Sequence, residues 1–301
     1  MKFGRLESLA GVDFTLPADL PATDTFLSGL PAPSGPPIIR IGTPRWADKS
    51  FVGTLYPPAT PARQYLRAYG EQLDTIELNA TYYRADAATI GKWAKEVPER
   101  FRFCPKLSKI ISHQLQLVDV DEATARFLDA IRSFGDRLGP AWLLLPDSFG
   151  PDRFALLERF IERWPKEIGL GVELRHPAWF ERGGEVAFDL FEARNVVSII
   201  TDTAGRRDVI HQRVTSSTVI LRFVGNALHP SDFERIDAWV RRLADWTSRG
   251  VTSVFIFLHQ PDEALNLPIA SRAITGLKAK TEADLTPIRE FPDPDGMQLS
   301  F

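Results

Sequence analysis

Eight short apolar runs follow one another between residues 38 and 260, and most of them end in a polar or charged residue. The runs read IIRIG, TIELN, FRFCPK, AWLLLPD, GVELRH, VSIITD, VILRF and VFIFLHQ. A segment with helical periodicity follows nearly every run, and this alternation is typical of parallel strands joined by helices. The pattern therefore predicts an α/β fold of the TIM-like (β/α)8 barrel class.

The segments between the runs carry apolar residues at helical spacing. Pro61 suits the first turn of a helix whose apolar positions are Tyr65, Leu66, Tyr69 and Leu73. Further helices are expected over residues 121–137, after an N-cap at Asp152, and from Ser231 onward. The segment TDTAGRRDVIHQ, which follows the sixth run, is short and polar and gives the weakest helical signal.

The alternation predicts a single domain with an extension at each end. In the N-terminal extension, residues 1–37, the run PAPSGPP disfavours helix and central strand because proline lacks an amide donor. This extension either covers the base of the barrel or is partly disordered. Residues 38–280 make up the predicted barrel. Residues 281–301, rich in proline and aspartate, are expected to form a tail on the surface.

Composition narrows the class of protein without naming a function. A chain of 301 residues with 44% hydrophobic and 25% charged residues is ordinary for a globular protein. The net charge of −3 and the lack of a long basic run disfavour nucleic acid as a partner. A single cysteine, Cys104, excludes an internal disulfide. No apolar segment suits a signal peptide or reaches the ~20 residues that span a bilayer, so we expect a cytoplasmic protein with no membrane partner.

Charged residues occur within several of the runs, where buried parallel strands are usually apolar. Side chains alternate between the two faces of a strand, so Glu77 lies opposite Ile76 and Leu78. The aliphatic set should face the helices and the charged set should point into the barrel or its mouth. The residues predicted to point inward in this way are Glu77, Lys106, Glu173, Arg175, Asp202 and Arg222.

This inward set has two interpretations. A lone buried charge costs several kcal/mol, so these residues must pair with one another or bind a charged ligand. One interpretation is an internal ion-pair network that does no chemistry. In the other, Lys106 serves as a base, a Schiff-base nucleophile or a phosphate clamp, and the arginines hold a carboxylate or phosphate. Glu77 and Glu173 then act as an acid/base pair, as metal ligands or as partners of the cations.

Six sequence blocks carry a family resemblance over about residues 38–275. They are GTPRW, TIELNATYYR, FRFCPKLSKIISH, LGPAWLLLPDSF, GVELRHPAWF and, more loosely, VILRFVG. In these blocks the chain resembles the YecE-like family, the domain of unknown function numbered 72. The resemblance implies a TIM-barrel fold and a site at the ends of the strands. It implies no reaction, because the activity of the family is not established.

The chain also departs from the family pattern. The usual Gln and second Pro of the fourth block are Leu144 and Asp147, and a usual His at the end of the run 219–223 is Val224. The paired Asn residues that usually close the last run are His259 and Gln260. Either the ligand differs on this side of the mouth, or this member has lost part of an ancestral activity.

The retained positions supply the candidate site. Candidate catalytic residues are Glu77, Lys106, Glu173 and His113, a histidine placed just past a strand where it could move protons. Trp46 and Trp179 follow strand ends, where each either walls a pocket or packs under a loop. The candidate substrate-binding residues are Asn79, Arg175, Arg222, Asp202, Trp46 and Trp179.

Three functions remain open from the sequence. The first is an enzyme that acts on a small polar or anionic metabolite at the C-terminal face of the barrel. The second is a barrel that binds a metabolite without catalysis. The third is a metal-dependent barrel enzyme acting on a sugar or nucleic acid, although Lys106 and Arg175 would repel a metal ion and no metal ligand is assigned. The cofactor and the oligomeric state stay unknown, and fold alone does not decide among the three.

Overall fold

The computed structural model describes residue 4, residues 6–289 and residue 291, and all paired strands in this part of the chain run parallel. Each predicted run forms a strand, and the run 197–202 is divided in two at Ile199. The strands are β1 (Ile38–Thr43), β2 (Thr75–Leu78), β3 (Arg102–Pro105), β4 (Ala141–Leu144), β5 (Leu170–Glu173), β6 (Val197–Ser198), β7 (Ile200–Asp202), β8 (Thr218–Val224) and β9 (Ser253–His259).

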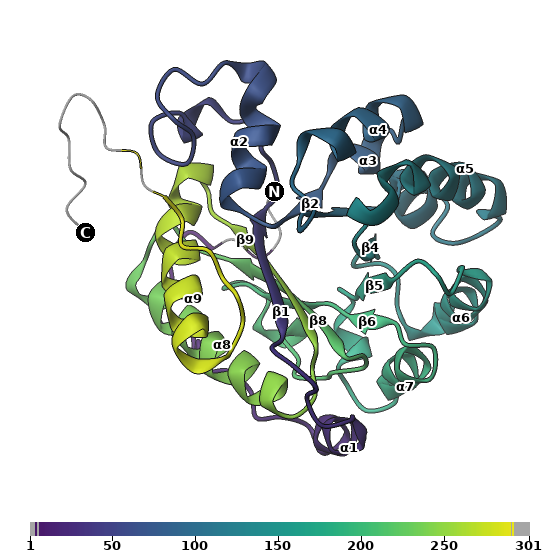
Figure 1. The fold of residues 1–301 in the computed structure, drawn as a ribbon. Helices are drawn as coiled ribbons and strands as arrows, with labels where there is room; N and C mark the ends of the chain where they lie inside the picture. Colours follow the sequence, from purple (N-terminus) through teal and green to yellow (C-terminus); the bar gives the residue numbers. More distant parts are fainter. Residues whose placement is uncertain (1–3, 5, 290, 292–301) are drawn as a thin grey trace.

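Helices surround the strands (Figure 1). Within the described residues, none of them is long and apolar enough to cross a membrane. The α-helices are α1 (Pro21–Gly29), α2 (Tyr65–Gln72), α3 (Ala80–Tyr83), α4 (Ala87–Glu96), α5 (Asp121–Ile131), α6 (Phe154–Arg163), α7 (Glu185–Ala193), α8 (Pro230–Ser248) and α9 (Asn266–Lys280).

The strands form two parallel sheets. One has six strands in the order β3-β2-β1-β9-β8-β7, and the other has three in the order β4-β5-β6. Two isolated bridges, Phe103–Leu138 and Lys106–Trp142, connect the β3 edge of the larger sheet to the β4 edge of the smaller. At the other edges, β6 pairs with β5 and β7 pairs with β8, and only Ile199 separates β6 from β7. The fold is therefore α/β with parallel sheets.

Alternation along the strands separates the apolar core into two kinds of cluster. Two large clusters combine one face of the strands with the helices, for example Phe103 with Phe134 and Leu221 with Trp239. A third cluster occupies the other face of the strands, and its members are Cys104, Trp142, Leu144, Val197, Ile199, Ile220, Phe255 and Phe257. Charged side chains of the same parity continue this second face toward the C-terminal ends of the strands.

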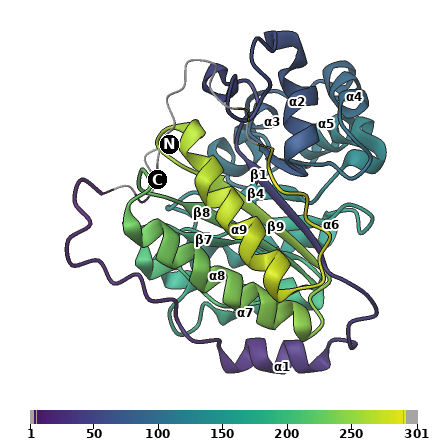
Figure 2. The ribbon, with the colours of Figure 1, turned by 60° about the vertical axis from the view of Figure 1, so that its left-hand side comes forward.

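The N-terminal extension touches both ends of the strands. In α1, the Thr23 hydroxyl donates to the Gln212 carbonyl at 2.6 Å and accepts from Val214 N at 3.2 Å, shortly before β8 begins. Gly4, in contrast, accepts hydrogen bonds from the Thr203 hydroxyl and Gly205 N, just after β7 ends. Figure 2 shows α1 below the strands and the chain before it rising alongside them. Helix α1 therefore lies at the base of the strands, and Gly4 lies at their opposite end.

Several local predictions need correction. Asp152 is not the cap of α6, because it lies within the 3-10 turn Pro151–Arg153 that precedes this helix. Helix α8 begins one residue before Ser231, at Pro230, and the His229 side chain caps it by accepting from Ser231 N. The unit after β7 has only a 3-10 turn, in agreement with its weak helical signal.

The beginning of the C-terminal tail also differs from expectation. Ala283 and Leu285 are buried in the core cluster around α8 and α9, so this part of the tail is not confined to the surface. Apolar side chains within the Pro- and Asp-rich segment account for the difference. Residue 290 and residues 292–301 lie outside the described part of the chain.

Gly42 tests the register between β1 and β2. An added Cβ at Gly42 would lie 2.0 Å from the Thr75 carbonyl oxygen, so Gly42→Ala should destabilise the protein by about 1–3 kcal/mol. Gly91→Ala in α4 is the matched control: nothing lies within 4 Å of the added Cβ, and alanine should stabilise the helix by about 0.5–1 kcal/mol. Denaturant unfolding measures both changes. Effects of the same sign would contradict this register.

Candidate functional site

Four charged side chains meet at the C-terminal ends of strands from both sheets. Glu77 is the third of the four residues of β2, and Lys106 directly follows β3. Glu173 is the last residue of β5, and Arg222 lies in β8. All four are almost completely buried. The register explains their meeting, because Glu77 pairs with Cys104 and Glu173 pairs with Leu144, both of which lie on the strand face that carries the third apolar cluster. Glu77, Lys106, Glu173 and Arg222 therefore share the strand face that carries the third apolar cluster, opposite the face that packs against the helices.

Glu77 forms one centre of this cluster. Its Oε1 forms an ion pair with Lys106 Nζ, and its Oε2 accepts from His259 Nε2 at 2.6 Å and lies 3.5 Å from Arg222 Nε. Lys106 Nζ also donates to Asn79 Oδ1 at 2.9 Å. Side chains from β8, β9 and the end of β3 therefore converge on one carboxylate of β2.

Glu173 forms the second centre of the cluster. Its Oε1 accepts from Arg175 Nε at 3.0 Å and Nη2 at 2.9 Å, and its Oε2 accepts from Trp142 Nε1 at 3.1 Å. Arg222 Nη1 lies 3.8 Å from Glu173 Oε1, so Arg222 stands between the two carboxylates. Lys106 Nζ is 5.3 Å from the centre of the Trp142 ring, within cation–π range.

The cations keep both carboxylates ionised. Burial opposes ionisation of Glu173, but Arg175, Arg222 and Lys106 outweigh it and lower its pKa to about 2. Burial likewise opposes ionisation of Glu77, yet Lys106, His259 and Arg222 hold its pKa well below the usual range. Both groups are therefore suited to act as fixed negative charges rather than as acids at neutral pH.

The pKa values of Lys106 and His259 are also lowered, which for these basic groups favours the neutral form. Burial lowers the pKa of Lys106, and Glu77 offsets this effect in part. Burial also lowers the pKa of His259 to about 4, despite its contact with Glu77, so its imidazole is neutral at pH 7. Among the described residues, the cluster brings the cations Lys106, Arg175 and Arg222 together around Glu77 and Glu173. Such a concentration of cationic donors suits an anion.

The cluster opens to solvent at one side. Glu77 and Glu173 are 0% exposed, whereas Arg175 keeps 9% and His259 8%. His113, in the π-helical turn Ile110–Gln114 after β3, lies close enough for Arg175 and Lys106, after burial, to lower its pKa. Its Nδ1 contacts the Ser112 hydroxyl at 2.9 Å. His113 is thus a neutral imidazole at the edge of the site.

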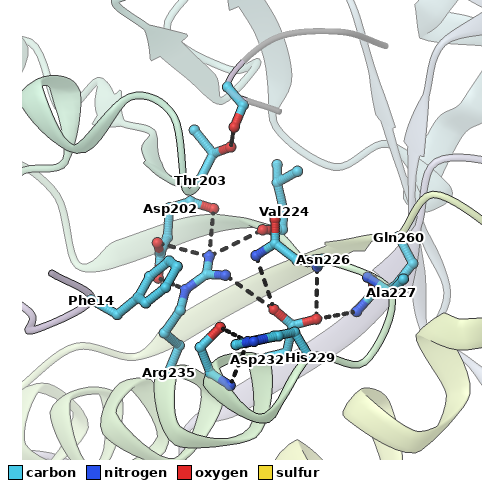
Figure 3. A network of polar contacts seen from close by, with 12 residues as sticks. Phe14, Asp202, Thr203, Val224, Asn226, Ala227, His229, Asp232, Arg235 and Gln260 are labelled. Atoms are coloured by element: carbon cyan, nitrogen blue, oxygen red, sulfur yellow. Dashed lines mark hydrogen bonds and ion pairs between the residues drawn. The ribbon is translucent and has the colours of Figure 1, made fainter. Parts of the chain in front are cut away.

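Asp202 does not belong to this cluster, and the prediction that it points inward is wrong. It pairs in register with Phe223, which packs toward the helices, and it shares a parity with Ile200 on the same side. Its carboxylate accepts from Arg235 Nη2 at 2.8 Å and Trp239 Nε1 at 2.7 Å, and it pairs with Arg207. Figure 3 shows Asp202 beside Arg235 of α8.

The Asp202 network holds loops and the N-terminal extension. Arg235 also pairs with Asp232 at 3.3 Å, and Asp232 in turn accepts from Asn226 N at 2.7 Å and Gln260 Nε2 at 3.2 Å (Figure 3). The Phe14 ring covers Arg235, with 5.2 Å from its centre to the guanidinium carbon. This network therefore fastens the loop after β8 and the extension, and its role is structural.

The two tryptophans also lie away from the charged cluster. Trp179 is buried in the core beneath the helices and donates its indole N–H to the Phe149 carbonyl at 2.7 Å. Trp46 packs edge-on against Trp93 and Phe103 on the helix side of the strands. The distances between ring centres are 5.1 Å to Trp93 and 6.4 Å to Phe103. Both follow the packing alternative of the sequence prediction, and neither contacts the carboxylates.

Sequence reasoning missed two members of the cluster. His259 contacts Glu77 directly, and its parity with Phe255 and Phe257 in β9 was the available signal. Trp142 donates a hydrogen bond to Glu173, and Lys106 lies over its ring. It belongs to the apolar run of β4, in which no alternation of polar and apolar residues distinguishes it from its neighbours.

The other departures from the family pattern have clear places. Leu144 and Val224 pair in register with Glu173 and His259, so they present apolar side chains beside the cluster. Gln260 accepts from Ala227 N at 2.9 Å within the Asp202 network. Asp147 lies 3.7 Å from Arg206, whose Nη2 donates to the Arg175 carbonyl at 2.7 Å.

A hollow of about 700 Å³ lies beyond the C-terminal ends of β8 and β9. Gly225, Asn226, Ala227, His229 and Pro261 form one side, and residues 6–10 of the extension form the other. The hollow thus adjoins the ends of the strands that carry Arg222 and His259.

The donor set of the cluster suits an anion better than a metal ion. In the part of the chain that the structure describes, no group of three or more His, Cys, Asp or Glu side chains is arranged to hold a metal. Glu77 and His259 do contact each other, but the same carboxylate pairs with Lys106 and lies beside Arg222. These cations would repel a metal ion at this place.

Sequence comparisons place the chain among proteins of unknown activity. The family model "Protein of unknown function DUF72" matches residues 40–293. The UPF0759 protein YecE of Escherichia coli K12 is 28% identical over 248 residues, covering 75% of this chain and 88% of that protein. The UPF0759 protein YunF of Bacillus subtilis is 28% identical over 153 residues, covering 48% of this chain and 52% of that protein. The resemblance seen in the sequence blocks is confirmed.

Two solved structures share the fold. A DUF72 family protein of Enterococcus faecalis matches with a TM-score of 0.69 at 18% identity, covering 85% of this chain and 98% of that one. A DUF72 family protein of Thermotoga maritima matches with a TM-score of 0.60 at 20% identity, covering 80% of this chain and 97% of that one. At these identities the likeness shows the fold alone.

Asp202→Asn tests the structural role of the outward network. Removing this charge leaves the buried Arg235 without its nearest partner, so we expect a loss of about 3–5 kcal/mol in the free energy of unfolding. Asp237→Asn, which breaks an exposed pair with Arg272, is the control and should cost under about 1 kcal/mol. Urea unfolding measures both. Equal losses in the free energy of unfolding would show that the Asp202 network does not stabilise the fold more than an exposed ion pair does.

His259 makes stability depend on pH in acid. Its pKa is about 4 in the folded protein and about 6.5 in the unfolded chain, so unfolding takes up a proton between these values. Its contribution is therefore present above pH 6.5 and lost as the pH falls toward 4. In His259→Asn the unfolding free energy should vary less steeply over this window, by up to about 1.4 kcal/mol per pH unit. Denaturant unfolding at pH 4.5–6.5 measures the slope, and an unchanged slope would contradict a neutral His259.

Proposed function

Because the chain belongs to the DUF72 family, whose activity its name leaves open, we propose that it is an enzyme acting on a small anionic metabolite at the C-terminal ends of its strands. One observation carries the proposal: among the described residues, the cations Lys106, Arg175 and Arg222 gather around two carboxylates in one cluster. An anionic group bound there would interact favourably with these cations.

We also propose that the two sheets are arcs of one (β/α)8 barrel, in which β6 and β7 together supply one strand. The bridges Phe103–Leu138 and Lys106–Trp142 support closure between β3 and β4. The pairing of β6 with β5 and of β7 with β8 supports it on the other side. Within this proposal residues 38–280 form the barrel domain, between the extension 1–37 and the tail 281–301. A barrel concentrates its chemistry where this cluster lies.

The residues of the proposed site bind the anion, transfer a proton or position the groups that do so. Arg175 and Arg222 offer planar donor groups that suit a carboxylate or phosphate. Lys106, whose pKa burial lowers, is the group that exchanges a proton with the bound metabolite. Asn79 orients the Lys106 ammonium group, and Glu77 and Glu173 act as fixed negative charges. His113, a neutral imidazole at the open edge, accepts or passes on the proton.

A second candidate is a protein that binds the same anion without changing it. The observation that favours it is the direct ion pairing of both carboxylates, which leaves neither poised to exchange a proton near neutral pH. The departures at Leu144 and Val224, which are apolar beside the cluster, point the same way. Recovery of the bound compound unchanged after prolonged incubation with the protein would identify this function.

A thermal-shift screen against phosphorylated metabolites, carboxylates and nucleotides tests the proposed site. A compound present at 100 times its Kd should stabilise the protein by about 2.7 kcal/mol. Arg175→Met should weaken that compound by about 10- to 100-fold, because a charge-assisted hydrogen bond contributes about 1.5–3 kcal/mol. Lys106→Met should abolish turnover of the same compound. Titration calorimetry and product analysis measure the two effects.

The matched control is Arg272→Met, which removes an exposed arginine paired with Asp237. Circular dichroism must show that every variant retains its fold. The anionic site is refuted if no compound in the screen stabilises the wild-type protein. Unchanged affinity in Arg175→Met would remove Arg175 from the site.

A further inference from the structure

Glu263 is a buried carboxyl group that neither the family resemblance nor the strand pattern singles out. It begins the short 3-10 helix Glu263–Leu265, four residues beyond His259, and is only 9% exposed. Its Oε1 lies 3.2 Å from Arg45 Nε, and its Oε2 accepts from Asn266 Nδ2 at 2.9 Å. Glu263 therefore has one charged partner and one neutral partner.

The neutral partner is suited to either protonation state of Glu263. Asn266 is fully buried, and its Oδ1 has no hydrogen-bond partner among the described residues. Its amide donates to the carboxylate as it stands, and rotated by 180° it would present its oxygen to a protonated carboxyl. The charged partner is equally adaptable, because Arg45 is largely exposed and also lies 3.6 Å from Asp48.

Glu263 is linked to the charged cluster through the loop after β1. Arg45 follows Pro44, whose carbonyl accepts from Asn79 Nδ2 at 3.4 Å, and the Asn79 oxygen accepts from Lys106. The negative charge of Glu77 also acts on Glu263. The loop after β1 and the field of Glu77 thus connect Glu263 to the charged cluster.

We propose that Glu263 is the positioning residue that couples anion binding at the cluster to the uptake of one proton. The inference rests on the proposed anionic site. A bound anion adds negative charge near Glu263, so its carboxylate takes a proton from solvent and becomes the neutral acid. Arg45, released from its ion pair, is then available to the anion. No bond other than the new O–H bond of Glu263 is formed.

The electrostatic surroundings of Glu263 support this role. Burial, the largest influence, raises its pKa, Arg45 opposes the rise, and Asp48 and Glu77 add to it, giving a value of about 7. Tyr69 of α2 also lies within its field, but burial raises the pKa of that phenol far above neutral pH. Glu77 and Glu173 stay ionised at neutral pH, so Glu263 is the carboxyl of this region that can change its charge there.

The first test needs no ligand and compares wild-type protein with Glu263→Gln. A pKa of about 7 in the fold and about 4.3 in the unfolded chain means that unfolding releases a proton between these values. The stability that Glu263 contributes is full below pH 4.3 and is lost as the pH rises through 7. Glu263→Gln, which mimics the neutral acid, should release close to one proton fewer on unfolding at pH 5–6.5. Glu162→Gln, an exposed carboxyl paired with Arg194, is the control and should behave as wild type.

A second variant gives a directional check. Arg45→Gln removes the cation that pairs with Glu263 and opposes its protonation, so the pH range of proton release should move upward. Arg45 is exposed, and its loss should leave the fold intact. An Arg45→Gln profile identical to wild type, or a Glu263→Gln profile identical to wild type, would overturn the assignment of Glu263 as the titrating group.

The coupling itself is measured by titrating sulfate, a dianion that does not titrate near pH 7, into the protein at pH 7.5. Calorimetry in two buffers of different ionisation enthalpy counts the protons taken up. We expect net uptake in wild type of up to about three quarters of a proton, because a group with a pKa of about 7 is already partly protonated at pH 7.5, and none in Glu263→Gln. Binding without uptake in wild type, or equal uptake in both proteins, overturns the coupling alone. No sulfate binding to either protein counts against the anionic site and removes the coupling with it.

Discussion

The buried guanidinium of Arg222 is the constraint on which the rest of this site depends. It lies between two carboxylates that are themselves fully buried, Glu77 and Glu173. Removing such charges from water costs several kcal/mol for each ion, so every one of them needs partners at short range. Those partners come from separate strands and even separate sheets, which only a fixed parallel register can bring together. The fold and the charge cluster therefore require each other.

Because side chains alternate between the two faces of each strand, the polar residues form two separate networks, one on each face. Arg222 and Thr201, paired in register, point to the cluster, whereas Asp202 and Phe223, one position on, point to α8. The outward network around Asp202 is closed on itself through Arg235 and Asp232 and fastens loops. The inward cluster gathers cations around two carboxylates and has an open edge. A shift of one residue thus separates a structural role from a site that can bind a ligand.

The sequence predicts the cluster where the parity of a strand is unambiguous. Glu77 is flanked by Ile76 and Leu78, so its direction follows from alternation. The run VSIITD carries aliphatic residues on both parities and breaks at Ile199, so the direction of Asp202 was open to error. Glu263 begins a three-residue 3-10 helix, which is too short to show a periodic pattern. The path of the extension depends on contacts such as Phe14 with Arg235. Long-range contacts of this kind leave no local pattern.

The departures from the family pattern place apolar side chains among the polar groups of the site. Leu144 and Val224 stand on β4 and β8 where the resemblance leads one to expect Gln and His, and they lie on the same strand face as Glu173 and His259. His259, neutral and bound to Glu77, keeps a polar contact that does not add charge. Lys106, Arg175 and Asn79, the groups that the proposed function assigns to an anion, are retained, and β4 lies between the strands that carry Lys106 and Arg175. Under the proposed function, the altered residues therefore change the shape and polarity of the space beside the anion and leave the requirement for a negative charge intact.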